Sequence, residues 1–247
     1  MNHTHRFDGK SEIYEKARPK YAAGLLDYLE NTLELPRGSI FADIGSGTGI
    51  FTDQLLNRGY KVFAVEPNSD MRRKAEEKLS GCDHFISVDG TDAATTLPDG
   101  SVDCITAAQA FHWFNAAAFR KECKRILKPH GKIVIVYNFR DESAECTKAL
   151  AELRRKYNPE FHGFSNGISD EKCRAFFDGP CSFFSADNSL TYDRQGYIRR
   201  VLSSSYSLQE TDSRYAEYLE EVNRLFDTFS VDGLLTVPTN TIAYVGE

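Results

Sequence analysis

A glycine-rich turn follows a short apolar segment that contains the acidic residue Asp43. Its glycines stand at alternate positions: Gly45, Gly47 and Gly49. Residues 51–58 then have the pattern of a helix that ends at Gly59. A strand, a glycine turn and a helix in this order are typical of a nucleotide-binding edge in an open α/β sheet. Glycine suits such a turn because a Cβ would keep the ligand away from the backbone, and because the turn can require positive φ.

The spacing of the glycines distinguishes two kinds of nucleotide site. A dinucleotide fingerprint has its third glycine three residues after the second, where this chain has Ile50. A second apolar segment, 61–65, is followed by Glu66, roughly 20 residues past the loop, where a carboxylate can accept hydrogen bonds from ribose hydroxyls. Glu66 therefore indicates a ribose without naming the cofactor. The alternative is a surface acid at the end of a strand.

Composition excludes several classes of partner. The net charge is −6 and no basic cluster is present, which argues against nucleic acid. No apolar run is long enough to span a bilayer, and the first residues lack the apolar core of a signal peptide. The six cysteines form no Cys-x-x-Cys pair. His3 and His5 have no neighbouring carboxylate or cysteine that would complete a metal site. We expect a cytoplasmic monomer or homodimer with reduced thiols and no metal.

Strand and helix patterns alternate five times in the first part of the chain. The expected strands are 40–44, 61–66, 84–88, 102–108 and 132–138. The expected helices are 21–33, 51–58, 67–81 and 115–128, with a short one at 11–17. The alternation predicts an α/β fold with a doubly wound, mostly parallel sheet. Beyond it we expect helices at 142–157, 194–202 and 213–229 and β-segments at 181–192 and 239–245.

Six segments together resemble the class I S-adenosylmethionine-dependent methyltransferases of the type 11 group, in the trans-aconitate methyltransferase-like branch. They are Phe41–Gly49, Val65–Asn68, Leu97–Asp103, Ala108–Phe114, Arg125–Pro129 and Tyr137–Asp141. Phe7–Gly9, Tyr14, Arg18–Pro19, Tyr21 and Leu202–Tyr206 also resemble that branch. The resemblance therefore covers nearly the whole chain but says little about the methyl acceptor. Two departures are Gly90-Thr91-Asp92-Ala93, where the group often has Gly-x-Ala-Glu, and Tyr137, where it often has Trp.

The resemblance implies a Rossmann-like, seven-stranded sheet in a single domain. Residues 1–35 would form an N-terminal helical lid and the first helix, and 36–141 the cofactor-binding core. Residues 142–247 would supply cap insertions, at 142–180 and 193–230, and the last two strands, the seventh of them antiparallel.

The resemblance also implies where S-adenosylmethionine would bind. Its methionine end would lie against Asp43, Gly45, Ser46, Gly47, Thr48 and Gly49. Glu66 would hold the ribose, while Pro67, Asn68 and Met71 would flank the ribose or adenine. Thr91, Asp92 and Ala93 would border the adenine, and Ala108 and Gln109 would complete the site. Met71 can equally be a core residue, and Asp92 a solvated turn acid.

The reacting groups are expected after the fourth strand, at the carboxyl ends of the strands. The candidate catalytic residues are His112, Gln109 and Tyr14. His112 is either a general base or a structural histidine next to Trp113. The candidate acceptor residues are Tyr14, Arg18, Tyr21, Trp113 and Arg140. For an anionic acceptor the candidate cations are Arg18, Arg140, Arg199 and Arg200, with surface arginines as the alternative for the last two.

These residues predict an S-adenosylmethionine-dependent methyltransferase that acts on a small molecule, with a carboxylic acid suggested by the branch it resembles. One alternative is a regulatory module that binds the cofactor without turnover. Another is an NAD(P)-dependent oxidoreductase, which Ile50 and the lack of a recognisable hydride-site pattern disfavour.

Overall fold

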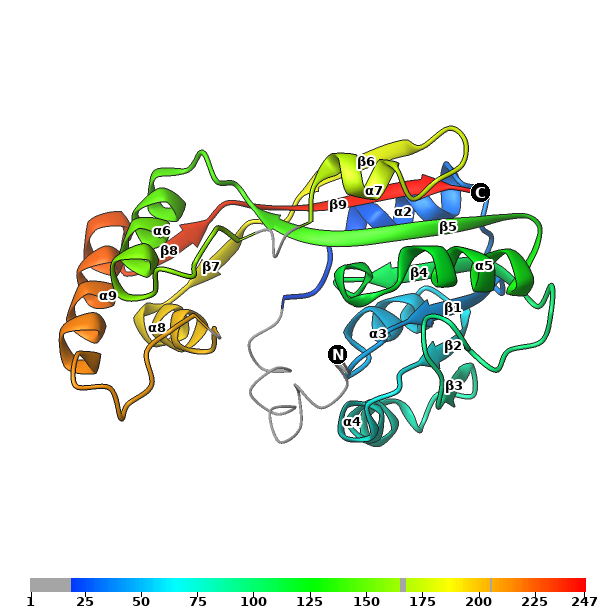
Figure 1. The fold of residues 1–247 in the computed structure, drawn as a ribbon, viewed down its shortest axis with the longest axis horizontal. Coiled ribbons are helices and arrows are strands. Elements are labelled where there is room, and N and C mark those ends of the chain that lie inside the picture. Colours follow the sequence, from blue (N-terminus) through cyan, green and yellow to red (C-terminus); the bar gives the residue numbers. More distant parts are fainter. Residues whose placement is uncertain (1–18, 165–167, 205) are drawn as a thin grey trace.

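The main sheet has seven strands in the order β3-β2-β1-β4-β5-β9-β6 (Figure 1). The structure is a computed structural model that describes residues 19–164, 168–204 and 206–247. The strands are β1 (Ile40–Ile44), β2 (Lys61–Val65), β3 (Phe85–Val88), β4 (Val102–Ala108), β5 (Leu127–Arg140), β6 (Ser182–Asp187) and β9 (Thr239–Gly246). Strands β1 to β5 are parallel, and β9 is antiparallel to both of its neighbours. The prediction of a doubly wound, mostly parallel, seven-stranded sheet is confirmed.

Helices cover both faces of this sheet. Along β5, Ile133, Ile135 and Tyr137 pack into one apolar cluster, while Val134 and Val136 pack into the other. The first cluster includes side chains of α5 (Ala116–Ile126) and α7 (Asp170–Arg174). The second includes side chains of α2 (Ala23–Asn31), α3 (Ile50–Asn57) and α4 (Ser69–Leu79). Burial on both faces explains the nearly continuous apolar run in β5.

A smaller unit with its own core forms the cap. A two-stranded sheet, β7 (Leu190–Tyr192) with β8 (Leu235–Val237), packs with α6 (Glu145–Tyr157), α8 (Arg194–Leu202) and α9 (Tyr215–Phe229). Figure 1 shows this group to the side of the main sheet, joined to it by the long strands β5 and β9. The two strands pair from Ile133 opposite Gly246 to Arg140 opposite Thr239. One rigid ladder therefore sets the position of the cap.

The prediction of one β-segment at 181–192 is wrong, because the structure has two separate strands there, β6 and β7. The chain breaks at Asn188, so that β6 ends the main sheet and β7 begins the cap sheet. The backbone N–H of Asn188 donates to the carbonyl of Thr239, and its side-chain amide donates to the carbonyl of Lys20 and to Asn138 Oδ1. These three bonds hold the break in place.

Part of the segment 142–180, which we expected in the cap, packs on the main sheet. Ile168, Cys173, Phe176 and Phe177 belong to the apolar cluster beneath α5, and the rings of Phe176 and Phe119 stack at 5.4 Å. The apolar spacing 173, 176, 177 places all three side chains on one face of the helical turn.

The expected helix 115–128 ends two residues early. Helix α5 stops at Ile126, and Leu127 already has the extended backbone of β5 and pairs with Val102. Lys128 precedes Pro129, and a residue before proline is disfavoured in helical conformation. The N-terminal lid lies outside the described residues, except for Pro19 onward. None of the described helices is long and apolar enough to cross a membrane, and none of the six cysteines forms a disulfide.

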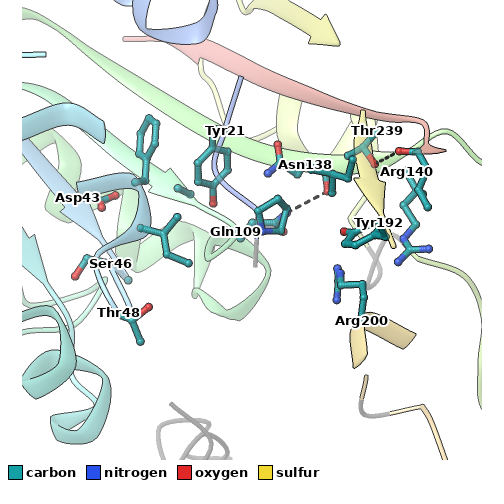
Figure 2. A pocket seen from close by; sticks show the side chains of 18 residues that line it. Tyr21, Asp43, Ser46, Thr48, Gln109, Asn138, Arg140, Tyr192, Arg200 and Thr239 are labelled. Carbon is teal, nitrogen blue, oxygen red and sulfur yellow. Dashed lines mark hydrogen bonds between the residues drawn. The ribbon is translucent and has the colours of Figure 1, made fainter. Parts of the chain in front are cut away.

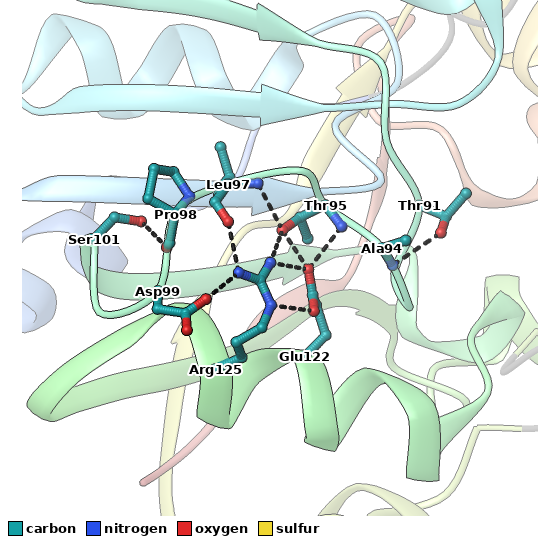
Figure 3. Close-up of polar contacts among 9 residues, drawn as sticks. All are labelled: Thr91, Ala94, Thr95, Leu97, Pro98, Asp99, Ser101, Glu122 and Arg125. Carbon is teal, nitrogen blue, oxygen red and sulfur yellow. Dashed lines mark hydrogen bonds and ion pairs between the residues drawn. The ribbon is translucent and has the colours of Figure 1, made fainter.

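A buried ionic network fastens the β3–β4 connection to α5 (Figure 3). Glu122 is 7% exposed, and its Oε1 accepts from the backbone N–H of Thr95 at 2.7 Å and from the Thr95 hydroxyl at 2.6 Å. Arg125 donates through Nη2 and Nε to the two oxygens of the same carboxylate, and through Nη1 to the carbonyl of Leu97 and to Asp99. Hydrogen bonding from Arg125 lowers the pKa of Glu122 to about 2. The network thus gives a structural role to segments 97–103 and 125–129, two of those that resemble the family.

Replacement of Glu122 by Gln should destabilise the fold by about 2–3 kcal/mol near neutral pH, because Arg125 and Thr95 lose a charged acceptor. The pKa of Glu122 is lower in the folded chain than in the unfolded one, so the carboxylate stabilises the fold above its unfolded pKa and less as the pH falls toward 2. Urea denaturation should show a parent–variant gap near pH 7 that narrows near pH 3.

Glu77→Gln is the matched control, because Glu77 forms exposed, solvent-screened pairs with Arg73 and Lys74 and should change stability much less than Glu122→Gln. An equal loss for both variants, or a Glu122→Gln loss independent of pH, would contradict this view of the network.

Candidate functional site

A cleft opens between the carboxyl ends of β1 and β4 and the cap (Figure 2). The predicted residues that line it are Tyr21, Asp43, Gly45, Ser46, Gly47, Thr48, Ala108, Gln109 and Arg140. Arg200, one of the candidate cations, also lines the cleft. Residues that the sequence analysis did not assign to the site include Ile50, Phe51, Asn138, Tyr192 and Thr239. In Figure 2 Asp43, Ser46 and Thr48 stand at one end of the cleft and Arg140 and Arg200 at the other, with Gln109 and Asn138 between them.

The three glycines of the loop have different tasks, although each has positive φ. A Cβ on Gly45 would lie 2.7 Å from Ala110 Cβ, and a Cβ on Gly49 would lie 2.8 Å from Leu79 Cδ1. Both glycines are therefore required by packing within the protein. A Cβ on Gly47 would meet nothing within 4 Å, although Gly47 lines the cleft. Only Gly47 leaves open space that a ligand would fill.

Glu66 holds the loop in shape. Its Oε2 accepts the backbone N–H of Gly47, and its Oε1 accepts the backbone N–H of Asn68, both at 2.9 Å. The carboxylate is 9% exposed, and burial raises its pKa while the two N–H donors oppose the rise. Each oxygen keeps a further lone pair for a hydroxyl. The predicted ribose acceptor is thus also the group that joins the loop to the next helix.

Asp43 is a buried acid beneath the loop. Its two oxygens accept from the hydroxyls of Thr52 at 2.7 Å and Thr106 at 2.8 Å, so it fastens β1 to β4 and to the first turn of α3. Burial raises the pKa of Asp43 to about 6, and the nearby carboxylate of Glu66 adds to the rise. A cation bound in the cleft would favour the ionised form, because an opposite charge lowers a carboxyl pKa.

The floor of the cleft is formed by Gln109 and Asn138. Gln109 has φ of 54°, a conformation that is uncommon for a non-glycine residue and is often found at functional sites. Its side-chain amide donates to the carbonyl of Asn138 at 3.1 Å. Asn138 Oδ1 accepts from the hydroxyl of Thr241, and its amide donates to the carbonyl of Lys20. The predicted residue Tyr21 is thereby held beside this floor, with its ring edge-on to Phe51 at 4.9 Å.

A second group of predicted residues lies beyond the cleft, around the ends of β2 and β3. Asn68 caps α4 by accepting from the N–H of Met71, which is a buried side chain. Asp92 Oδ2 accepts from the N–H of Asn115, and burial raises the pKa of Asp92. The lining set of the cleft does not contain Gly49, Glu66, Pro67, Asn68, Met71 or residues 91–93. Their roles toward a cofactor stay predictions.

His112 and Trp113 form the short helix η2 (Phe111–Trp113) and are not part of the described lining. The hydroxyl of Tyr137 accepts the backbone N–H of His112 at 3.0 Å and lies 3.4 Å from His112 Nδ1. Tyr137, the departure from the usual Trp, therefore orders η2. The proposed base role of His112 remains a prediction. Tyr14 and Arg18 lie outside the described residues.

Comparison with known proteins identifies the family. A profile described as "Methyltransferase domain" matches residues 42–135. An uncharacterised methyltransferase of Geobacillus kaustophilus is 32% identical over 67% of this chain and 75% of its own length. The chain belongs to the methyltransferase family.

Further relatives agree with this assignment. A fission-yeast protein, an uncharacterised methyltransferase-like protein of Schizosaccharomyces pombe, is 32% identical over 61% of this chain. A solved structure from Anaeromyxobacter dehalogenans, named as a type II methyltransferase, shares the fold with a TM-score of 0.69 at 21% identity, over 93% of this chain and 97% of its own. The methyltransferase chain spans little more than half the length of several curated relatives, including 58% of the fission-yeast protein.

Several lining residues of this methyltransferase carried only weak sequence signals. Asn138 stands in a segment that resembles the family, but its hydrogen bonds to Lys20 and Thr241 join segments far apart in the chain. Arg200 lines the cleft, whereas its neighbour Arg199 is exposed. Helical periodicity can tell which of these two arginines lies on the cleft side of α8 only after the residues of α8 that pack in the cap core, Tyr197 and Val201, are known.

Gly47→Ala should keep the fold and weaken binding of the cofactor, because the new Cβ would enter open space in the cleft. We expect a cost to stability of about 1 kcal/mol from the positive φ, and an affinity loss of at least about tenfold. Gly45→Ala should instead destabilise the fold by about 2–4 kcal/mol, because its Cβ would collide with Ala110. Thermal unfolding and calorimetric titration measure the two effects.

Gly100→Ala is the matched control. Gly100 has φ of 56°, close to the 58° of Gly47, and its surroundings are also open, but it is remote from the cleft. It should lose comparable stability and no affinity. A Gly47→Ala variant that binds the cofactor as tightly as the parent would show that the glycine loop does not form the cofactor-binding site.

Proposed function

We propose that this chain is an S-adenosylmethionine-dependent methyltransferase whose acceptor is a small carboxylic acid. The observation that carries the proposal is the cleft itself, which runs from the glycine loop past Gln109 to Arg140. One end has the family's cofactor loop and the other has guanidinium groups. We further propose a cytoplasmic monomer or homodimer, and the net charge of −6 supports a protein that does not bind nucleic acid.

The residues present fit the cofactor. The open space over Gly47 is a cradle that any Cβ would fill, which suits close approach of a ligand to the backbone. Asp43 and Glu66 provide two buried carboxylates with raised pKa values, which suits a ligand that carries positive charge. Gly45 to Thr48 and Asp43 would hold the methionine end, and Glu66 the ribose. When bound, S-adenosylmethionine supplies a methyl group on a positively charged sulfur.

The guanidinium end supports an anionic acceptor. Arg140 lines the cleft, and guanidinium can pair a carboxylate through two parallel hydrogen bonds. A carboxylate needs no proton removed before it accepts a methyl group. The chain's own contribution would then be orientation, with Gln109 and Asn138 fixing the floor between the two ends.

Two readings remain as outcomes of the test. Family membership disfavours a nicotinamide oxidoreductase. A regulatory module would retain the cofactor loop but transfer no methyl group.

Calorimetric titration should show binding of S-adenosylmethionine and of its demethylated product, and none of NAD. Incubation with S-adenosylmethionine and a panel of small carboxylic acids should then yield products that carry one added methyl group. Because a methyl ester is cleaved by mild base, treatment with hydroxide should regenerate the acid, whereas an N-methyl product would survive. The matched control is Gly47→Ala, which should lower product formation in proportion to its lost affinity.

Tight binding of NAD without binding of S-adenosylmethionine would refute the cofactor assignment. Binding without methylation of any acid in the panel would favour the regulatory module, and a base-stable product would refute the carboxylate acceptor.

A further inference from the structure

Strand β6 forms one edge of the main sheet. Among the described strands it pairs with β9 alone, and Figure 1 shows it at the margin of the sheet. Its residue Phe183 is 46% exposed and is one of three large apolar side chains that are exposed in the part of the chain that the structure describes. An open edge that also exposes an apolar side chain is a surface on which another strand can pair.

The hydrogen bonds to β9 show which residues of β6 direct their backbone groups outward. One residue beyond the paired register, the N–H of Asn188 donates to the carbonyl of Thr239. In an antiparallel ladder, residues that bond to the neighbouring strand alternate with residues that do not. Counting back from Asn188, we infer that Phe183, Ser185 and Asp187 direct their N–H and C=O groups to the open edge.

The features that usually prevent edge pairing are weak in β6. Natural edge strands carry lysine or proline, contain a bulge, are very short, or are covered by another element. The six residues of β6 include neither lysine nor proline, and their pairing with β9 runs without a break from Ser182 to Asp187. The only charged residue, Asp187, is the last one of the strand. Since Ser182, Phe183, Ser185 and Asp187 are all exposed, the edge is accessible.

We propose that β6 pairs with β6 of a second copy of this chain, antiparallel and around a two-fold axis at Ser185. The proposal goes beyond the proposed function, does not depend on it, and selects the homodimer from the two oligomeric states given above. In this register Ser185 lies opposite its own copy, and Phe184 lies opposite Ala186. Phe183 lies opposite Asp187. The three outward residues of each copy then exchange backbone hydrogen bonds with the other copy, and the two main sheets become one continuous sheet.

The side chains on the α2 face of β6 fit this register. Phe184 and Ala186 both lie on that face, since a Cβ on Gly24 of α2 would be 3.8 Å from each of them. The ring of Phe184 also contacts the ring of Tyr28, with 4.9 Å between the centroids. Across the two-fold axis each large Phe184 side chain would meet a small Ala186 side chain, which avoids a collision between two aromatic rings.

The charges on the α7 face favour an antiparallel second copy. The guanidinium of Arg174 lies 5.7 Å from the centroid of the Phe183 ring, near the start of β6, and Asp187 ends the strand. Antiparallel pairing would bring Asp187 of the second copy next to this guanidinium, whereas parallel pairing would place like charges together. Arg174 also pairs with Asp170 on the surface, and its five N–H donors can serve a second carboxylate. The strand is thus complementary to itself in both size and charge.

The first test is sedimentation equilibrium of the full chain over the nanomolar to micromolar range. We expect twice the mass of one chain at micromolar concentration. Ser185→Pro should raise the dissociation constant at least about tenfold, because proline removes the outward N–H at the two-fold axis. Since that N–H does not bond to β9, proline at this edge position leaves the ladder of the single chain intact. Ser185→Ala is the matched control, which keeps the N–H and should dimerise like the parent.

A cross-linking experiment tests the register. Hydrogen-bonded residues that face each other across antiparallel strands have Cα atoms about 5.5 Å apart, a separation that suits a disulfide. Ser185→Cys should therefore give a covalent dimer under mild oxidation. Ser182→Cys is the matched control, because Ser182 is also exposed on β6 but would lie opposite Asn188. The parent chain, oxidised in the same way, gives the background from the six native cysteines.

A chain that sediments as a single copy throughout the micromolar range would overturn the proposal, as would a folded Ser185→Pro variant that dimerises like the parent. Cross-linking of Ser182→Cys as efficient as that of Ser185→Cys would also overturn it. If Ser185→Pro does not fold, the cross-linking decides. The described lining of the cleft contains no residue of β6, so failure to bind S-adenosylmethionine would reject the proposed function and leave the dimer standing.

Discussion

The two hydrogen bonds that Glu66 accepts are the constraint on which the site depends. They join the N–H of Gly47, in the loop after β1, to the N–H of Asn68, at the start of α4. Without them a buried and a partly buried N–H donor would lose their acceptor, and the loop would lose its connection to α4. One carboxylate thus shapes the loop, and its role toward a ribose stays a prediction.

The second organising feature is the β5–β9 ladder, whose paired strands connect the main sheet to the cap. Asn138 bonds to Thr241 on that ladder, to Lys20 and to Gln109, so hydrogen bonds join the floor of the cleft to the segment before α2. Two residues further along β5, Arg140 faces the cap. Strand β5 therefore positions both Asn138 and Arg140 in the lining of the cleft.

The sequence predicts those features of the fold that depend on local patterns of residues. Alternate glycines, the acid at Asp43 and the apolar run of β5 predicted the sheet and the glycine loop that lines one end of the cleft. It could not predict the break at Asn188, because the bonds that hold it reach Lys20 and Asn138, far away in the chain. The burial of Arg154 was equally invisible, since it depends on Phe161 and Phe164 and on how α6 and α8 pack. Family resemblance marked Arg125 without showing that Glu122 and Thr95 are its partners.

Hydrogen–deuterium exchange on the full chain, with and without S-adenosylmethionine, tests most directly whether the loop Gly45–Gly49, which bonds to Glu66 through Gly47, binds the cofactor. Binding should slow exchange in peptides that cover residues 43–54 and 106–113, while peptides that cover 128–132, at the opposite ends of the strands, should not change. NAD at the same concentration should protect neither region. Unchanged exchange at 43–54, with saturating cofactor shown to be bound, would contradict the account.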